Sequence, residues 1–361
     1  MKRILAILCL LLVSVAAFAT RPYVPPPCPG TPTGYYVSGK QLFSPLDTPV
    51  VLHGVNDNHW DQVAAAKTGI PLTGANAVRL EVDFAQTAAT NQAAVDPLLK
   101  AGLVTIIGNW KGTCKVDSPT LTAIVDTWVA QAPTWTQAKY QSTLLINIAN
   151  EWGPANNVVW RDQYLAAIAR MRAAGYMQPL VIDSGNCGQD VADVVTYGPA
   201  LLAADPQHNV LFDVHVYGYF AAPALKSWQQ DFNKAMTALG ATGLPVLIGE
   251  YGPGLNVGSS PTLITPEQVL AASKAQGFVG DMAWSYNDNN LAGCKTADTG
   301  WFGMTTYCAT FTGKPTDLTA FGRKMVPLLR SMNGMPALQS LAPAAAFNAT
   351  FAPSATLPGQ Q

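Results

Sequence analysis

The 361-residue sequence has few charges, and neither sign dominates. Only 12% of its residues are charged, and the formal net charge is −1. Proteins that bind nucleic acid or an anionic membrane surface need a basic face, which this composition does not supply. We therefore expect neither nucleic acid nor a membrane as a partner. Aromatic residues are plentiful, with nine Trp, twelve Tyr and twelve Phe, and such rings suit neutral ligands such as sugars.

Several chemical motifs are also missing. The chain has only four His and lacks the C-x-x-C and H-E-x-x-H spacings, so we expect no metal site. It lacks the G-x-S-x-G elbow of serine esterases. The first expected strand is followed by His53–Gly54–Val55–Asn56–Asp57 rather than by a glycine-rich phosphate turn. The sequence therefore predicts an activity without a cofactor.

One apolar run lies close to the N-terminus, and it is too short to span a bilayer. Lys2 and Arg3 precede it, it extends from Ile4 to Val15, and Ala17–Phe18–Ala19 follows as a cleavage motif. This order is typical of a secretory signal peptide. We expect residues 1–19 to be removed after Ala19, and the mature chain to be extracellular or periplasmic and free of the membrane.

Cysteines are few, and in an exported protein they are expected to form disulfides. Cys294 and Cys308 are the nearest pair in the sequence and are one candidate bond. Cys114 and Cys187 each closely follow an expected strand and are a second candidate. Cys28 is left over, and other pairings of the five cysteines stay open.

The rest of the chain divides into three segments. Residues 20–34 contain three consecutive prolines and are expected to be a stiff linker, and residues 336–361 an Ala/Pro-rich flexible tail. Residues 35–335 alternate between strand and helix patterns, with eight units of roughly thirty residues, which predicts a single (β/α)₈ barrel. A doubly wound open sheet is the alternative. The expected strands are Val50–Asn56, Ala77–Val82, Val104–Trp110, Leu144–Trp152, Pro179–Gly185, Val210–Gly218, Pro245–Gly252 and Phe278–Tyr286.

Two of these strands end in a glutamate, Glu151 and Glu250. A carboxylate at the end of a buried strand is costly to desolvate and adds nothing to packing. Strands four and seven lie on opposite sides of an eight-stranded barrel, so both glutamates are expected to face each other across the active-site end. Such a pair is suited to glycosidic cleavage, with retention of configuration at a separation of ~5–5.5 Å and inversion at ~6.5–9.5 Å.

Other strand ends contribute a ring of polar and aromatic side chains. These candidates are Asn56, His59, Arg79, Glu81, Asn109, Trp110, Asn150, Trp152, His215, Tyr217, Tyr251, Trp284 and Tyr286.

Three stretches of the chain carry a resemblance to a known family. Asn150–Glu151, His215–Val216–Tyr217 and Gly249–Glu250–Tyr251–Gly252 follow strands four, six and seven in that order. In this the chain resembles glycoside hydrolase family 5, in the clan of retaining β-glycosidases on (β/α)₈ barrels, over about residues 45–330. Within the family it is most similar to bacterial endo-β-1,4-mannanases.

The resemblance implies that Glu151 is the acid/base and Glu250 the nucleophile. It further implies that Asn150 binds the substrate 2-hydroxyl, that Arg79 keeps the nucleophile ionised, and that Trp284 is a sugar platform. His215 and Tyr217 would complete the network, with Asn109, Trp110 and Trp152 as supporting candidates.

The chain departs from the family at two strands. Asn109 stands where a strand-three His is expected, and Asn186–Cys187–Gly188–Gln189 stands where the family tends to have a Trp. We expect a monomeric endo-β-1,4-glycanase acting on plant polysaccharide, with mannan or glucomannan preferred. An endo-β-1,4-glucanase and a non-catalytic carbohydrate-binding barrel are the alternatives. Arg79 as a structural ion-pair partner, His215 as a core histidine and the Trp side chains as packing groups also stay open.

Overall fold

The computed structural model describes residues 34–57, 68–221, 227, 229–253, 264–287, 302–305 and 310–338. The chain separates into two compact units, Met1–Pro32 and Thr33–Gln361, and all described residues belong to the second. The expected signal peptide, the linker up to residue 33 and the tail beyond residue 338 lie outside the described residues. So do His59, Cys28, Cys294 and Cys308.

Eight parallel strands close into a barrel, which confirms the expected fold over an open sheet. Each expected strand is present, and neighbours pair in the order β10-β11-β4-β5-β6-β7-β8-β9. The strands are β4 (Leu52–Asp57), β5 (Ala77–Glu81), β6 (Val104–Gly108), β7 (Leu144–Asn147), β8 (Leu180–Asp183), β9 (Val210–Val216), β10 (Val246–Tyr251) and β11 (Gly280–Ala283).

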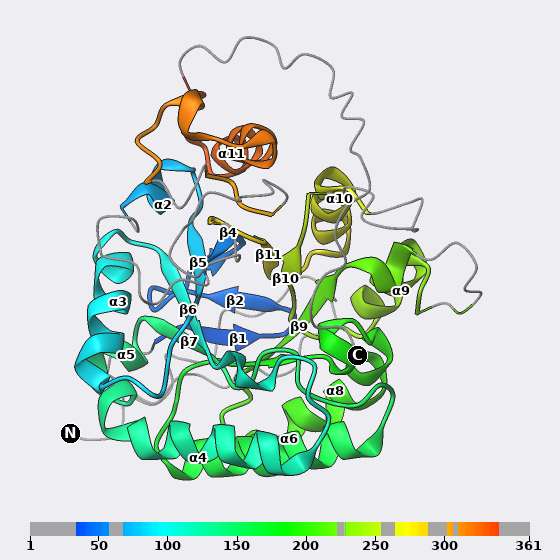
Figure 1. Cartoon of the computed structure of the whole chain (residues 1–361). Coiled ribbons are helices and arrows are strands. Elements are labelled where there is room, and N and C mark those ends of the chain that lie inside the picture. The colour runs from blue at the N-terminus through cyan, green and yellow to red at the C-terminus, as the bar shows by residue number, and fades with distance from the viewer. Residues whose placement is uncertain are drawn as a thin grey trace, which may run out of the picture. The chain divides into compact units, whose positions relative to one another are not determined.

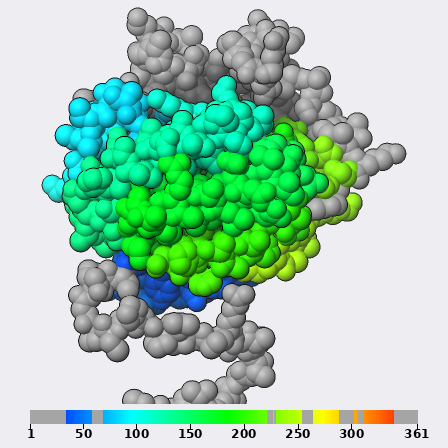
Figure 2. Space-filling model, turned by 90° about the horizontal axis from the view of Figure 1, so that it is seen from below, coloured from blue at the N-terminus to red at the C-terminus, as the bar shows by residue number. Residues whose placement is uncertain are grey.

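Helices surround the strands (Figure 1), and α4, α6 and α8 form a continuous outer face in Figure 2. Side-chain caps begin several of them; Thr265, for example, forms a capping box with Gln268. The helices are α2 (Gly69–Leu72), α3 (Ala88–Lys100), α4 (Ser118–Trp135), α5 (Ala138–Gln141), α6 (Val158–Ala173), α7 (Gly185–Gly188), α8 (Val191–Ala204), α9 (Phe232–Ala241), α10 (Pro266–Gln276) and α11 (Ala320–Met332), with 3₁₀ turns η1 (Trp110–Gly112), η2 (Gly218–Ala221) and η3 (Pro315–Asp317). None of the described helices is long and apolar enough to cross a membrane.

The apolar side chains of each strand alternate between two clusters, because successive side chains point to opposite faces of the sheet. On β5, Val78 and Leu80 pack outward against the helices, whereas Ala77 belongs to a second cluster inside the barrel. This inner cluster fills only the part of the barrel near the N-terminal ends of the strands. The inward positions further along the strands are polar, and they form the site described below.

A small antiparallel sheet, which the sequence did not predict, precedes the barrel. It consists of β1 (Tyr36–Ser38), β2 (Gln41–Phe43) and β3 (Pro49–Val50). Leu42 of this sheet is fully buried in the inner cluster, and Val37 and Val50 pack against that cluster. The sheet therefore covers the end of the barrel away from the site.

Candidate active site

Arg79 on β5 is the centre of a buried polar layer at the C-terminal ends of the strands. Its guanidinium is fully buried and contacts side chains from β4, β7, β8, β9 and β10, so it reaches across the barrel interior. Its hydrogen-bond acceptors are Glu250 Oε1 (2.8 Å), Asn56 Oδ1 (3.1 Å), Asn147 Oδ1 (3.1 Å), Asn150 Oδ1 (2.5 Å) and Asp183 Oδ2 (3.3 Å), and Asp213 Oδ2 lies 3.9 Å from Nε.

Burial alone would lower the pKa of Arg79, but the carboxylates of Asp183, Glu250 and Asp213 outweigh it and raise the pKa. The guanidinium is therefore a permanent positive charge. The expected contact between Arg79 and the Glu250 carboxylate is present.

The Glu250 carboxylate is held at both oxygens. Oε1 accepts from Arg79, and Oε2 accepts a 2.9 Å hydrogen bond from the Tyr217 hydroxyl. Burial raises the pKa of Glu250 above its ordinary value, although His215 and Arg79 act in the opposite direction. His215 and Arg79 therefore limit the rise in the pKa of Glu250 without reversing it.

Glu151 lies in a turn, four residues beyond the last residue of β7, rather than within the strand as expected. Its φ of 53° is in the left-handed region, which is uncommon for a residue with a side chain. The turn is fixed by hydrogen bonds: the Glu151 N–H donates to Asp183 Oδ2 (2.8 Å), and the Asn150 N–H donates to the Asn109 carbonyl (2.8 Å). This conformation directs the Glu151 side chain over the polar layer.

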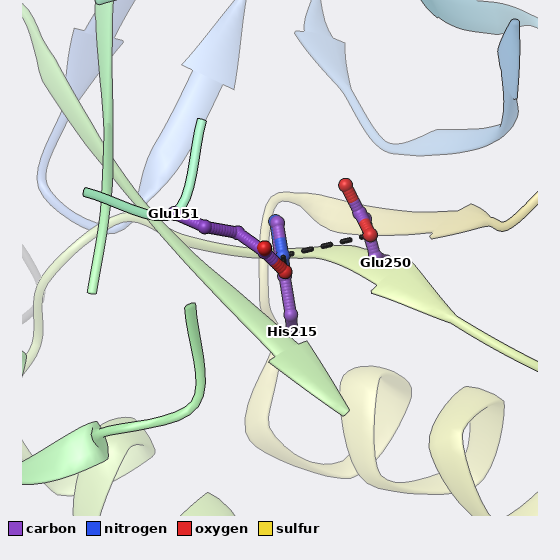
Figure 3. Close-up of side chains that lie close together, drawn as sticks. All are labelled: Glu151, His215 and Glu250. Atoms are coloured by element: carbon purple, nitrogen blue, oxygen red, sulfur yellow. Dashed lines mark hydrogen bonds and ion pairs between the residues drawn. The ribbon is translucent and has the colours of Figure 1, made fainter. Parts of the chain in front are cut away.

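His215 on β9 lies between the two glutamates (Figure 3). Its Nδ1 is 2.9 Å from Glu151 Oε1 and 3.6 Å from Glu250 Oε2. Burial would lower the pKa of His215, but the carboxylates of Glu250, Asp213 and Glu151 raise it well above its ordinary value. The carboxylates thus favour the protonated form of the ring, and the contact of Nδ1 with Glu151 makes His215 part of the site rather than a core histidine.

Gly188 packs directly against this imidazole. Its φ is +72°, and a Cβ placed on it would lie 2.6 Å from His215 Nδ1. We expect Gly188→Ala to displace the ring and to lower activity by at least about tenfold, the scale of one lost hydrogen bond to a charged group. Gly243→Ala is the matched control, because Gly243 has a φ of +69° with nothing within 4 Å of the added Cβ. Both variants carry the cost of a positive φ, and Gly188→Ala should lose further stability in thermal unfolding because of the contact with His215. Equal activity in the two variants, at a temperature where both are folded, would contradict the prediction.

Asp183 and Asp213 are site residues that the sequence analysis missed. They are directly paired across β8 and β9 and are fully buried. Burial raises the pKa of Asp183 to about 7, assisted by the Asp213 charge and opposed by Arg79. Each interrupts an apolar strand just as Glu250 does. The signal that marks the glutamates, a carboxylate in a buried strand with no packing role, is present at both aspartates as well.

Two tryptophans border the polar layer. The Trp110 ring lies 5.3 Å from the Arg79 guanidinium carbon, and its centroid is 5.0 Å from that of Trp284. Both are partly exposed, as a surface for a sugar ring requires. The Trp284–Ser285 peptide bond is cis. The aromatic side chains expected from strands three and eight therefore come together beside Arg79.

Two of the predicted supporting residues have side chains that do not face the carboxylates. The Asn109 side chain caps η1 by accepting from the Lys111 N–H (3.0 Å), so it faces away from the carboxylates. The Trp152 ring is fully buried, donates to the Asp117 carbonyl (2.9 Å) and packs edge-on against Tyr164. Both are structural, because the turn after each strand rotates these side chains away from the barrel axis.

The disulfide expected between Cys114 and Cys187 is formed, with a Cα–Cα distance of 4.4 Å. It joins the segments that follow β6 and β8. The other expected bond, Cys294–Cys308, lies outside the described residues.

Two groups of side chains within the described ranges have spacings that a metal ion could use, Glu151/His215/Glu250 and Asp183/Asp213/His215. His215 belongs to both groups. Metal ligation needs a neutral imidazole, whereas the surrounding carboxylates raise the pKa of His215 and so favour its protonated form. Arg79 also already supplies a cation to this cluster. The donor set fits a network of charged hydrogen bonds better than a metal centre.

Comparisons with known proteins agree with this geometry. Residues 47–290, more than half of the chain, match the model of the cellulase family, glycosyl hydrolase family 5. A mannan endo-1,4-beta-mannosidase of Cellvibrio japonicus is 30% identical over 271 residues, which are 71% of this chain and 60% of that protein. One from Salipaludibacillus agaradhaerens is 27% identical, covering 71% of this chain and 82% of that protein.

Solved structures show the same fold. A beta-mannanase from Streptomyces thermolilacinus with mannohexaose superposes with a TM-score of 0.69 at 23% identity, covering 86% of this chain and all of that one. An endoglucanase of Thermobifida fusca superposes with a TM-score of 0.59 at 17% identity, covering 83% of this chain and all of that one. With the closed barrel and the matched residues together, the chain belongs to glycosyl hydrolase family 5.

Proposed function

We propose that this protein is a secreted retaining endo-β-1,4-mannanase, with Glu250 as nucleophile and Glu151 as acid/base. The observation that carries the proposal is the position of the two carboxylates. An oxygen of Glu151 and an oxygen of Glu250 lie within 4.8 Å of each other, with His215 between them. So short a separation is expected of a retaining enzyme, whose carboxyl groups stand ~5–5.5 Å apart, and it leaves too little room for the water molecule of an inverting mechanism.

In the first step, Glu250 attacks the anomeric carbon while Glu151 donates its proton to the departing glycosidic oxygen. Arg79 and Tyr217 donate to separate oxygens of Glu250 and so fix the attacking group. Holding the attacking carboxylate in place before the reaction lowers the entropic part of the activation barrier.

In the second step, Glu151 takes a proton from a water molecule. The water oxygen attacks the anomeric carbon, and the bond between the sugar and Glu250 breaks to release the Glu250 carboxylate. His215 Nδ1 forms a hydrogen bond with Glu151 Oε1, which leaves Oε2 as the oxygen that exchanges the proton. In its protonated form, the His215 ring between the two glutamates also offsets their mutual repulsion when both are ionised.

The preference for mannan rests on the curated relatives, several of which are named mannan endo-1,4-beta-mannosidases. Mannan and cellulose chains differ in the orientation of one hydroxyl per sugar. Release of reducing ends from galactomannan and from carboxymethylcellulose should be measured side by side. We expect hydrolysis of galactomannan to be at least about tenfold faster, which is the discrimination that one hydrogen bond supplies. Activity on carboxymethylcellulose alone would favour an endoglucanase instead.

The raised pKa of Glu250 has a consequence for the pH profile. The nucleophile acts as a carboxylate, so kcat/KM is lost as the pH falls through its pKa. Because burial raises that pKa, the acid limb should lie above the ~4.3 of an ordinary glutamate. A profile of kcat/KM against pH on a soluble mannan measures it, and an acid limb below that value would contradict the proposed environment of Glu250.

Export of the chain is supported by two features. Residues 1–19 have the order of a signal peptide, and the Cys114–Cys187 disulfide is of a kind that persists in oxidising compartments.

A further inference from the structure

The Cys114–Cys187 disulfide lies directly beside the carboxylate of Glu151. Cys114 Sγ is 3.5 Å from Glu151 Oε2. A disulfide sulfur carries no hydrogen, so this contact is not a hydrogen bond. Glu151 Oε1, in contrast, faces the His215 Nδ1–H. The disulfide is therefore the neighbour of the oxygen that is free to exchange a proton.

The backbone around Glu151 is linked on both sides to the segments that carry the cysteines. The Gly153 N–H donates to the Lys115 carbonyl (2.8 Å), and the Gly153 carbonyl accepts from the Asn186 N–H (2.8 Å). Lys115 follows Cys114, and Asn186 precedes Cys187. The turn that bears Glu151 thus lies between two segments, and the disulfide closes those segments across it.

The three residues that meet here all have left-handed backbones. The φ angles of Cys114, Glu151 and Cys187 are 55°, 53° and 54°. Such conformations are costly for residues with side chains and persist only where the surroundings enforce them. The disulfide is the one covalent link that the described residues offer for this purpose.

We propose that the Cys114–Cys187 disulfide positions Glu151 for proton transfer, acting as a covalent strap across its turn. The inference rests on the proposed function, because it assigns the strap to the acid/base step alone. It also gives a role to the departure from the family at Cys187.

Cys114 is exposed and Cys187 is partly exposed, so a dithiol reductant has access to the bond. Reduction would add two electrons and two protons to give two thiols, while the dithiol is oxidised to a cyclic disulfide.

The double variant Cys114→Ser/Cys187→Ser separates positioning from folding when it is assayed on two substrates. Galactomannan has an alkoxide leaving group that must be protonated, whereas dinitrophenyl β-mannobioside releases a phenolate that needs no acid. General acid catalysis contributes roughly 10²–10⁴-fold. We expect the double variant to lose about tenfold or more in kcat/KM on galactomannan and less than about twofold on the aryl substrate, at a temperature where it is folded by circular dichroism.

Two controls complete the experiment. Dithiothreitol should impose the same selective loss on the wild-type enzyme and have no further effect of this kind on the double variant. Asp117→Ala removes the cap of α4 in the neighbouring segment without touching Glu151, and it should affect both substrates equally. An equal loss on both substrates in the double variant, or no loss on either, would overturn the inference. A wild-type enzyme inactive on both substrates would overturn the proposed function itself, and the inference with it.

Discussion

Glu250→Ala is expected to reduce hydrolysis of mannan by about four orders of magnitude or more, equivalent to at least ~5 kcal/mol of transition-state stabilisation. The variant lacks the group that attacks the anomeric carbon, and no second described carboxylate reaches that position. The residual rate is measured from reducing-end release at high enzyme concentration. Glu267→Ala is the control, because this glutamate pairs with Lys324 on the surface and should leave activity unchanged.

The two glutamates can be told apart by adding azide, a small anion that replaces a missing carboxylate. In Glu151→Ala, the glycosyl–Glu250 intermediate still forms from a substrate with a good leaving group, and azide should attack it to give a β-glycosyl azide. In Glu250→Ala, azide should attack the substrate itself from the opposite face and give the α-anomer. The same anomer from both variants, or a fully active Glu250→Ala, would contradict the assigned roles.

The second large effect is expected from Arg79→Met, which should destabilise the fold by about 3–5 kcal/mol, the usual result of breaking a buried ion pair from one side. Arg79 is the guanidinium that neutralises Asp183, Asp213 and Glu250 in the barrel interior. Methionine fills a similar volume but leaves these carboxylates without that cation. Thermal unfolding should show a drop on the order of 10 °C, at about 2–4 °C per kcal/mol for a domain of this size.

The pH dependence of this loss follows from linkage. Burial raises the pKa of Asp183 and Glu250, and without Arg79, which opposes this rise, both have a higher pKa in the folded than in the unfolded state. The folded state then binds more protons, so stability falls as the pH rises through the range between the two values. Arg79→Met should therefore lose less stability near pH 5 than near pH 8. Adding Asp183→Asn should recover part of the loss at pH 8. An equal loss at both pH values, unaffected by the second substitution, would show that the destabilisation is not electrostatic.

Much of the barrel could be predicted because its strands are buried on both faces. Continuous apolar runs such as Leu144–Ile146 are read directly as interior strands, and the rule that barrel sites lie at the carboxyl ends of strands then selects Glu250 and Arg79. The order of strands four and seven was sufficient to bring Glu151 and Glu250 together.

The rest could not be predicted because it depends on local turns. Glu151 and Trp152 are adjacent in the sequence, yet the left-handed backbone at Glu151 sends one side chain into the site and the other into the core. After β6, the 3₁₀ turn η1 brings Trp110 to Arg79, while the side chain of the preceding Asn109 caps that turn. The strands of the N-terminal sheet are two or three residues long, too short to show a periodic pattern.

A retaining mechanism requires Glu250 to form a covalent bond with the sugar. In a 2-deoxy-2-fluoro mannosyl substrate, the fluorine slows both steps. A good leaving group speeds up the first step again, so the glycosyl–Glu250 intermediate accumulates. Peptide mapping by mass spectrometry should then find one sugar attached to the peptide that contains Glu250, at that residue. A sugar attached to Glu151 instead, or an unlabelled enzyme that releases the inverted anomer, would contradict the account.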